Sequence, residues 1–186
     1  MTIKPIIFVI LFSGFLFIGC DAPVRNASNY FDCPRYFDRL ADSLANTTAA
    51  LEKTMATNGA TETLKINKPD WRAELLPFHE LNISKPAQQG TYRVDTLITN
   101  GGFRIEHSAM VEDASVRTLA IEYDSSGTVL SVFAVTASKN PYHASADTLY
   151  YQSKGEYQIS ALSDPALGKS ISFDLTGKIV PQTAHQ

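Results

Sequence analysis

The sequence predicts an α+β domain in which an N-terminal amphipathic helix packs on a curved antiparallel β-meander of about seven to eight strands. Three observations support this prediction. Apolar residues recur at helical spacing through residues 37–55, the pattern changes to alternation from Thr91 onward, and turn signals separate the alternating stretches. Because short connections force successive strands to run antiparallel, we expect a meander.

The strongest helical pattern covers residues 37–55. Its apolar stripe consists of Phe37, Leu40, Ala41, Leu44, Ala45, Thr48, Leu51 and Met55. Asp32 is suited to cap the start, Pro34 suits the first turn, and Asn58-Gly59 provides a left-handed stop. The stripe has the width of a helix that packs on a core, so we expect this helix to cover one face of the sheet.

A second helical piece is expected after Asp70. Residues 61–67 alternate and indicate a short strand or an extended arm before it. Pro77 is expected to break or kink the helix, because its ring removes a hydrogen bond and clashes with the preceding turn. The apolar side of the piece carries Trp71, Leu75, Phe78 and Leu81. Trp71, the only tryptophan, is interpreted first as a core anchor and alternatively as a ligand platform.

The strands of the meander follow a loop at residues 82–90. They are predicted at residues 91–98, 103–111, 119–123, 129–137, 148–153, 157–161, 171–173 and 179–180. Asn100-Gly101 is a strong hairpin signal. Residues 129–137 are apolar on both faces, which indicates a central or doubly covered strand. We expect a loop at residues 138–146 and a turn at Thr176-Gly177.

The first twenty residues have the features of an export signal. Lys4 supplies a positive charge, and residues 6–18 are almost wholly apolar. This run is shorter than the about 20 residues that a permanent span needs. It ends at Phe17-Ile18-Gly19-Cys20, which resembles the lipobox of bacterial lipoproteins, although Leu is commoner where Phe17 stands. The resemblance implies that Cys20 is acylated and becomes the mature N-terminus.

This interpretation divides the chain into a signal peptide at residues 1–19, a tether at 20–29 and a single α+β domain at 30–186. It implies a bacterial cell-envelope location with an anchor in the outer membrane, while the inner membrane and the cell surface stay open. An ordinary cleaved signal and a single anchor helix are the alternatives. Acylation of Cys20 would leave Cys33 without an intramolecular partner. We interpret Cys33 as a small apolar residue near a helix start, with a reactive thiol or an intermolecular bridge as the alternatives.

Composition argues against a nucleic-acid partner. The 186 residues include 16 Lys plus Arg and 19 Asp plus Glu, giving a formal charge of -3. A mildly acidic surface of mixed charge also argues against binding to anionic lipid through a polybasic patch.

Templates for catalytic, phosphate and metal sites fail at specific positions. Gly168-Lys169-Ser170 resembles the tail of a phosphate loop, but Ser163 stands where glycine is required. His79-Glu80 begins like a zinc-protease helix, but Ile83 replaces its second histidine. We expect no metal, no cofactor and no enzymatic activity. The alternatives are an envelope hydrolase whose groups converge only in the fold, such as His107 with His143, and a periplasmic lipid or lipoprotein carrier.

Carboxylates near predicted strand ends are interpreted as the solvent face of the sheet: Glu106, Asp113, Glu122 and Asp124. The candidate ligand contacts are instead aromatic, because tyrosine offers contact area and a hydroxyl at low entropic cost. They are Tyr142, Tyr150, Tyr151, Tyr157 and Trp71. Three segments, at residues 42–44, 95–97 and 147–149, match an Asp-Ser/Thr-apolar O-glycosylation signal, although a sugar would not fit beside the apolar stripe at Ser43.

The signal with its lipobox, the helix, the stretch at residues 70–75 and the strand-rich C-terminal half together resemble an uncharacterised family of Gram-negative bacterial lipoproteins. The resemblance implies no activity and no site residues. A helix-lined curled sheet is also similar to the half-barrel carriers of the periplasm, by architecture alone. We therefore expect a membrane-anchored, non-enzymatic binding module for a protein, an envelope polymer or a lipid.

Overall fold

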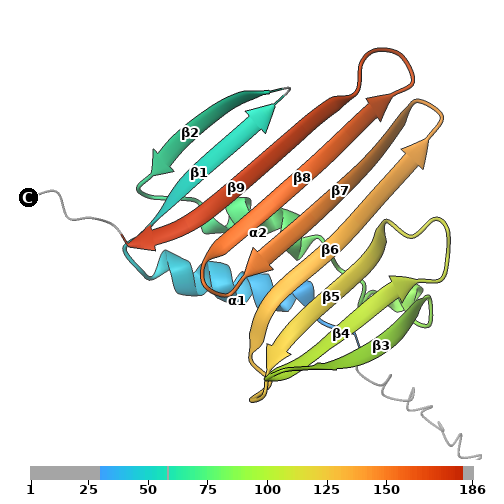
Figure 1. Cartoon of the computed structure of the whole chain (residues 1–186), viewed down its shortest axis with the longest axis horizontal. Helices are drawn as coiled ribbons and strands as arrows, with labels where there is room; N and C mark the ends of the chain where they lie inside the picture. The colour runs from blue at the N-terminus through green and yellow to red at the C-terminus, as the bar shows by residue number, and fades with distance from the viewer. Residues whose placement is uncertain (1–29, 58, 182–186) are drawn as a thin grey trace, which may run out of the picture.

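The structure is a computed structural model that describes residues 30–57 and 59–181. One open antiparallel sheet dominates it, with strand order β2-β1-β9-β8-β7-β6-β5-β4-β3 (Figure 1). The helical elements are α1 (Cys33–Ala45), α2 (Trp71–His79) and the 3-10 helix η1 (Pro86–Gln88). The strands are β1 (Ala49–Thr57), β2 (Ala60–Ile66), β3 (Tyr92–Thr99), β4 (Gly102–Ala109), β5 (Val116–Asp124), β6 (Val129–Asn140), β7 (His143–Gln152), β8 (Glu156–Pro165) and β9 (Ile171–Pro181). This confirms the predicted α+β class with a curved meander.

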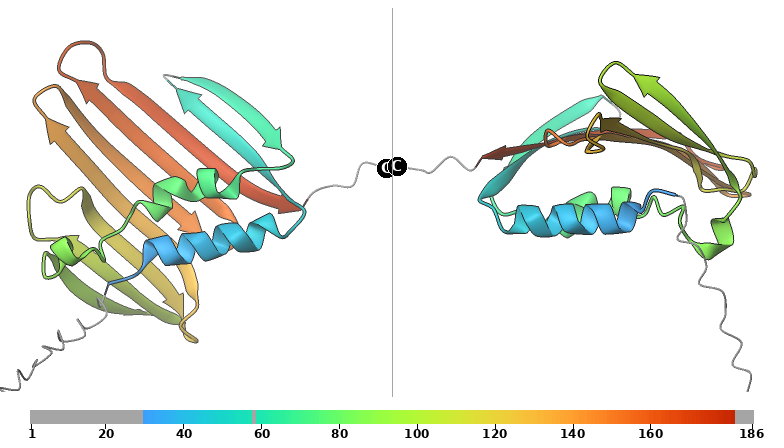
Figure 2. Two further views of the ribbon diagram at one scale, coloured as in Figure 1. Left: turned by 180° about the vertical axis from the view of Figure 1, so that it is seen from behind. Right: turned by 90° about the horizontal axis from the view of Figure 1, so that it is seen from below.

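The strands from β3 to β9 each pair with the next one along the chain, as a meander requires. The β1–β2 hairpin then adds to the far side of β9, so that β2 and β3 form the two edges. Figure 2 shows that the sheet curves and that α1 and α2 lie side by side on its concave face. The helices therefore form a second layer that covers part of one face.

The first helix is shorter than the sequence predicts. α1 ends at Ala45, and the residues predicted to continue it form β1, which pairs with β2 and β9. The polar residues after Ala45 close the helix: the Asn46 side chain donates to the Asp42 carbonyl at 2.8 Å, and the Thr47 hydroxyl donates to the Leu44 carbonyl at 2.7 Å. Hydrogen bonding to two neighbouring strands outweighs the helical spacing of the later residues.

Both helices begin at the predicted aspartates. Asp32 accepts a hydrogen bond from the Arg35 amide at 3.0 Å, and Asp70 accepts from the Arg72 and Ala73 amides at 3.1 and 3.2 Å. The break that was predicted as one alternative at Pro77 is wrong, because α2 continues to His79, whereas the other alternative, a kink, stays a prediction. The proline lies in the last turn on the exposed side, where water can satisfy the carbonyl left without a donor.

Two predicted irregular segments belong to long strands. Residues 138–146 are not a loop, because β6 continues to Asn140 and β7 begins at His143. β9 is continuous through the predicted turn at Thr176-Gly177, and Gly177 pairs with Lys53 and Tyr157 on either side. A Cβ at Gly177 would overlap the Tyr157 ring, so the absent side chain makes room for an aromatic ring.

The core between the helices and the sheet is aromatic. The ring centroid of Phe37 lies 5.2 Å from that of Phe78 and 5.3 Å from that of Tyr151, and Phe78 lies 5.9 Å from Tyr157. Tyr151 and Tyr157 are paired across β7 and β8 and are almost fully buried. Offset and edge-on ring contacts of this kind stabilise the seating of both helices beyond the area that they bury.

We expect Gly177→Ala to lower the free energy of unfolding by about 1–3 kcal/mol, the usual cost of forcing an extra methyl group into a packed core. Urea denaturation of the two proteins measures the difference. Thr176→Ala is the matched control, because this neighbour is exposed on the opposite face of the same strand. Equal losses in the two variants would contradict the packing role of Gly177.

Candidate binding surface

The sheet extends beyond the helices at one end. Figure 2 shows the connections β6–β7 and β8–β9 projecting past α2, with no helix beneath them. We call this region, residues 139–143 and 162–171, the loop end. Its two connections are tied together, because the Ala166 amide donates to the Tyr142 carbonyl at 2.9 Å.

Large apolar side chains are open to solvent at the loop end. Tyr142 is 81% exposed and Leu167 is 93% exposed. Leu162 near the end of β8 is 48% exposed and Ile171 at the start of β9 is 46% exposed, and they face opposite sides of the sheet because Ile171 pairs with Ser163. Single exposed apolar residues are ordinary, but several gathered at one end of a molecule are typical of a contact surface.

Local hydrogen bonds hold this surface in shape. The Asn140 side chain accepts from the Tyr142 amide at 2.9 Å, and Asp164 accepts from the Ser170 hydroxyl at 2.7 Å. Gly168 has a φ of 125°, which side chains rarely adopt, so glycine suits this bend. A surface ordered before binding loses less conformational freedom when a partner docks.

Of the predicted aromatic contacts, only Tyr142 is exposed. Tyr150 is half-buried on the convex face, where its hydroxyl accepts from the Gln152 side chain at 2.9 Å. Tyr151 and Tyr157 point to the concave face and are 2% and 1% exposed, so a surface ligand cannot touch them and their prediction as contacts is wrong. Neighbouring strand residues face opposite sides, and this alternation separates the cluster that is close in sequence.

Trp71 and Cys33 are core residues. Trp71 is 4% exposed, which confirms the core-anchor interpretation and excludes the surface-platform alternative. Cys33, the first residue of α1, is fully buried, and burial raises the pKa of its thiol.

Leu167 belongs to the candidate surface, but the sequence did not predict it as a contact. The available signal was a large apolar residue between turn-forming neighbours, Pro165 and Gly168.

A largely buried polar cluster fastens α2 to the sheet. The Tyr157 hydroxyl donates to Glu74 Oε2 at 2.9 Å, and Lys53 Nζ lies 2.7 Å from the same oxygen. Burial raises the pKa of Tyr157, and the Glu74 charge adds to this effect. The cluster joins residues 21 and 83 positions apart, so no local sequence pattern indicated it. Lys53, Glu74 and Tyr157 bind one another, and this arrangement is suited to holding α2 on the sheet.

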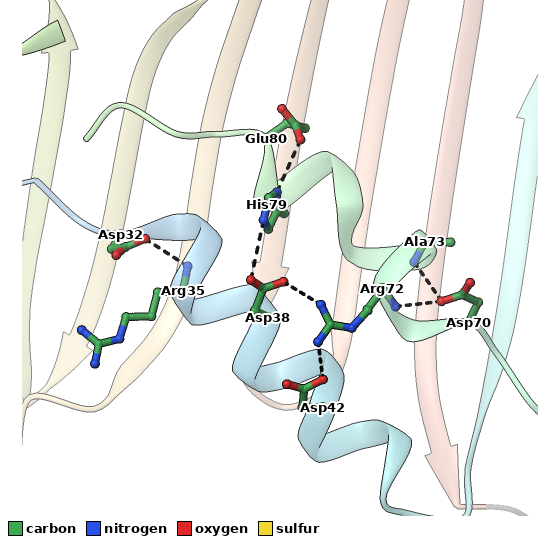
Figure 3. A network of polar contacts seen from close by, with 9 residues as sticks. All are labelled: Asp32, Arg35, Asp38, Asp42, Asp70, Arg72, Ala73, His79 and Glu80. Carbon is green, nitrogen blue, oxygen red and sulfur yellow. Dashed lines mark hydrogen bonds and ion pairs between the residues drawn. The ribbon is translucent and has the colours of Figure 1, made fainter. Parts of the chain in front are cut away.

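A second polar network joins α1 and α2 on their outer side (Figure 3). Arg72 lies 3.3 Å from Asp38 and 2.7 Å from Asp42, while His79 lies 3.8 Å from Asp38. The adjoining hollow has a volume of about 170 Å³. Because the Arg72 side chain is 63% exposed, solvent weakens these pairs, and each contributes less than about 1 kcal/mol. The network aligns the two helices.

The acidic residues of the meander lie on its solvent side, as the sequence indicated. Arg104 lies between Glu106 and Glu122 on the convex face, at 2.8 and 3.7 Å. Asp124 lies in the β5–β6 turn, where hydrogen bonds from Ser126 and from the Thr128 amide lower its pKa. Asp113 is exposed in the turn after β4. The described residues contain no group of three or more His, Cys, Asp or Glu side chains placed to hold a metal ion.

His107 is buried in the core on β4. Its Nδ1 lies 3.2 Å from the Leu119 carbonyl, and its ring meets Tyr30 edge-on with centroids 5.5 Å apart. Burial lowers its pKa. His143 lies on β7, three strand positions away, which corresponds to a separation of at least about 14 Å. The two histidines therefore do not converge.

Comparisons with known proteins add little. No family model and no curated protein matches the chain. Among solved structures, the S-type phycobiliprotein lyase CPES from Guillardia theta is similar at 10% sequence identity, with a TM-score of 0.28 over 83% of this chain and 95% of that one. Across residues 30–57 and 59–181, no helix combines the length and the apolar character required to cross a membrane.

The burial of His107 makes stability depend on pH. Because the pKa of His107 is lowered in the folded protein, the unfolded chain binds more protons as the pH falls below about 6.5. The contribution of His107 to the free energy of unfolding is therefore complete above about pH 6.5 and is lost below it. Urea unfolding between about pH 7.5 and pH 5 should show a smaller decline for His107→Asn than for the wild type. Equal declines would contradict this assignment.

Proposed function

We propose that this protein is a membrane-anchored lipoprotein of the bacterial cell envelope that acts as a non-enzymatic binding module. Its contact surface is the loop end. The observation that carries the proposal is the pair of exposed side chains Tyr142 and Leu167 on ordered, hydrogen-bonded connections. The anchor is Cys20, which lies outside the described residues and rests on the signal and lipobox pattern.

The anchor and the contact surface belong to different parts of the fold. Tyr30, the first described residue, packs against Tyr92 of β3 with ring centroids 5.8 Å apart and does not belong to the loop end. The loop end belongs to β6, β7, β8 and β9. A tether that leads to Tyr30 leaves those connections free to meet a partner. The ten residues at positions 20–29 would reach at most about 35 Å.

The favoured partner is an envelope protein with an apolar surface. A carrier of acyl chains needs an apolar cavity, whereas rings such as Phe37 and Phe78 fill the space beneath the sheet. The hollow between the helices, about 170 Å³, is partly lined by Asp38 and Arg72. Larger surface hollows of about 330, 360 and 400 Å³ are lined mainly by small, polar and charged side chains. These features favour surface recognition over enclosure of a lipid.

We expect Cys20→Ser to move the protein from the membrane fraction to the soluble fraction, because acyl chains supply about 0.8 kcal/mol of membrane affinity per buried methylene. Fractionation of cells that express the full chain measures the change, and mass spectrometry of the wild type should find an acylated Cys20. Cys33→Ser is the control and should remain in the membrane. An unmodified Cys20 in the wild type would overturn the anchor.

A photoreactive amino acid at position 142 or 167 should cross-link to the same envelope protein in intact cells. Position 154, in the β7–β8 turn at the other end of the same strands, is an exposed control. The double variant Tyr142→Ser, Leu167→Ser should reduce co-purification of that partner at least tenfold. Its free energy of unfolding should stay within about 0.5 kcal/mol of the wild type, because both residues are exposed. Cross-linking no stronger at 142 and 167 than at 154 would overturn the assignment.

A further inference from the structure

The two edges of the sheet differ in how they meet solvent. β2 carries Glu62 and Lys65, and its large apolar residue Leu64 is 39% exposed. β3 is exposed along its whole length after Tyr92, with Leu97 at 55% and Ile98 at 84%. Edge strands offer unpaired backbone groups, and charges usually protect them from pairing. Each edge strand carries two charges, but those of β3, Arg93 and Asp95, lie near its start, and no charge follows them at the exposed end with Leu97 and Ile98.

The free backbone groups of β3 can be assigned from its pairing with β4. The Met110 amide donates to the Thr91 carbonyl at 2.8 Å, which continues the register that pairs Tyr92 with Ala109. Hydrogen-bonded and non-bonded pairs alternate along an antiparallel ladder. The odd-numbered residues of β3 therefore bond to β4. The even-numbered residues direct their amides and carbonyls to the free edge, and these are Tyr92, Val94, Thr96 and Ile98.

We propose that a second copy of this chain pairs with β3, antiparallel, about a two-fold axis at Val94. Such an axis, perpendicular to the sheet, keeps the concave faces of both copies on the same side and places free amides opposite free carbonyls. Val94 then meets the partner's Val94. Arg93 lies opposite the partner's Asp95, and Asp95 lies opposite the partner's Arg93.

Charge complementarity selects this register. Arg93 and Asp95 share the convex face of β3. In the single chain they form an ion pair with each other, with Arg93 Nε 2.8 Å from Asp95 Oδ2. Their side chains are 68% and 49% exposed. About Val94, two arginines and two aspartates alternate around the axis, and opposite charges across strands stabilise pairing. An axis at Tyr92 or at Thr96 would place neither charge opposite its complement. On the concave face, Val94 is 43% exposed and supplies an apolar contact at the axis.

This self-association goes beyond the proposed function and uses a different surface. β3 is an edge of the sheet, whereas the loop end is formed by β6 to β9. A pair of single strands is a modest interface, so we expect a weak dimer that forms where copies are concentrated, as two-dimensional confinement on a membrane would ensure.

Disulfide trapping in the full chain tests the register. Paired residues at the axis have Cα atoms about 5.5 Å apart, within the range that a disulfide bridges. Val94→Cys should therefore give a covalent dimer under mild oxidation in native membranes. Thr96→Cys is the matched control, because it points to the same face of the same strand but would lie about 13 Å from its copy. It should give at least tenfold less dimer. A covalent dimer from Thr96→Cys in place of Val94→Cys would overturn this register.

Charge reversal in the Val94→Cys background tests the partner. Arg93→Asp alone and Asp95→Arg alone place like charges opposite one another and should each reduce the dimer several-fold. The double reversal restores opposite charges and should recover the dimer yield. Urea midpoints equal to that of the parent confirm that the variants fold.

Unchanged yields in the single reversals, or a disulfide between Val94→Cys and a different protein with no dimer, would overturn the proposal. Tyr142→Ser with Leu167→Ser should leave the dimer yield unchanged. The proposal for the loop end and the proposal for the β3 edge can therefore be contradicted independently.

Discussion

The structure depends on the contact between two short helices and the concave face of one large sheet. An open antiparallel sheet needs a cover on its apolar face. Here the rings of Phe37 and Phe78 meet Tyr151 and Tyr157, which the β7–β8 register places opposite each other. Gly177 on β9 leaves the space that the Tyr157 ring occupies, and the Tyr157 hydroxyl then reaches Glu74 on α2. Strand register and helix position are therefore fixed by the same side chains.

The lengths of the elements explain why other surfaces stay open. α1 has 13 residues and α2 has 9, which correspond to about 20 and 14 Å. β6 has 12 residues and spans about 40 Å, and eight spacings between nine strands give a width of about 38 Å. Two helices of this size cannot cover such a sheet. The loop end and the β3 edge remain free because the cover is too small, and the ordered local hydrogen bonds keep the loop end in shape without it.

Local patterns in the sequence predicted the class, the meander, the helix cap at Asp32, the helix start after Asp70 and the hairpin at Asn100-Gly101. Alternation and capping depend on neighbouring residues. Prediction was wrong where distant residues decide. Leu51 and Met55 have helical spacing in the sequence, but in the fold they lie in β1 and pair with β9. Gly177 has the sequence signature of a turn, but it lies within β9, where the Tyr157 ring occupies the space of the absent side chain. The tyrosine cluster had the right composition for binding, but strand alternation buries Tyr151 and Tyr157 and leaves only Tyr142 at the candidate surface.

The distribution of polar chemistry bears on what kind of recognition this fold supports. Glu74, Asp38, Arg72, Arg104 and Glu122 bind partners within the chain, where they hold helices to one another, to the sheet or across neighbouring strands. Two other kinds of group are open to solvent at the candidate surfaces: apolar side chains at the loop end and backbone amides and carbonyls along β3. Apolar contact recognises shape, and strand pairing recognises register through backbone groups and cross-strand charge pairs. Open surfaces of these kinds support the proposed docking against other proteins.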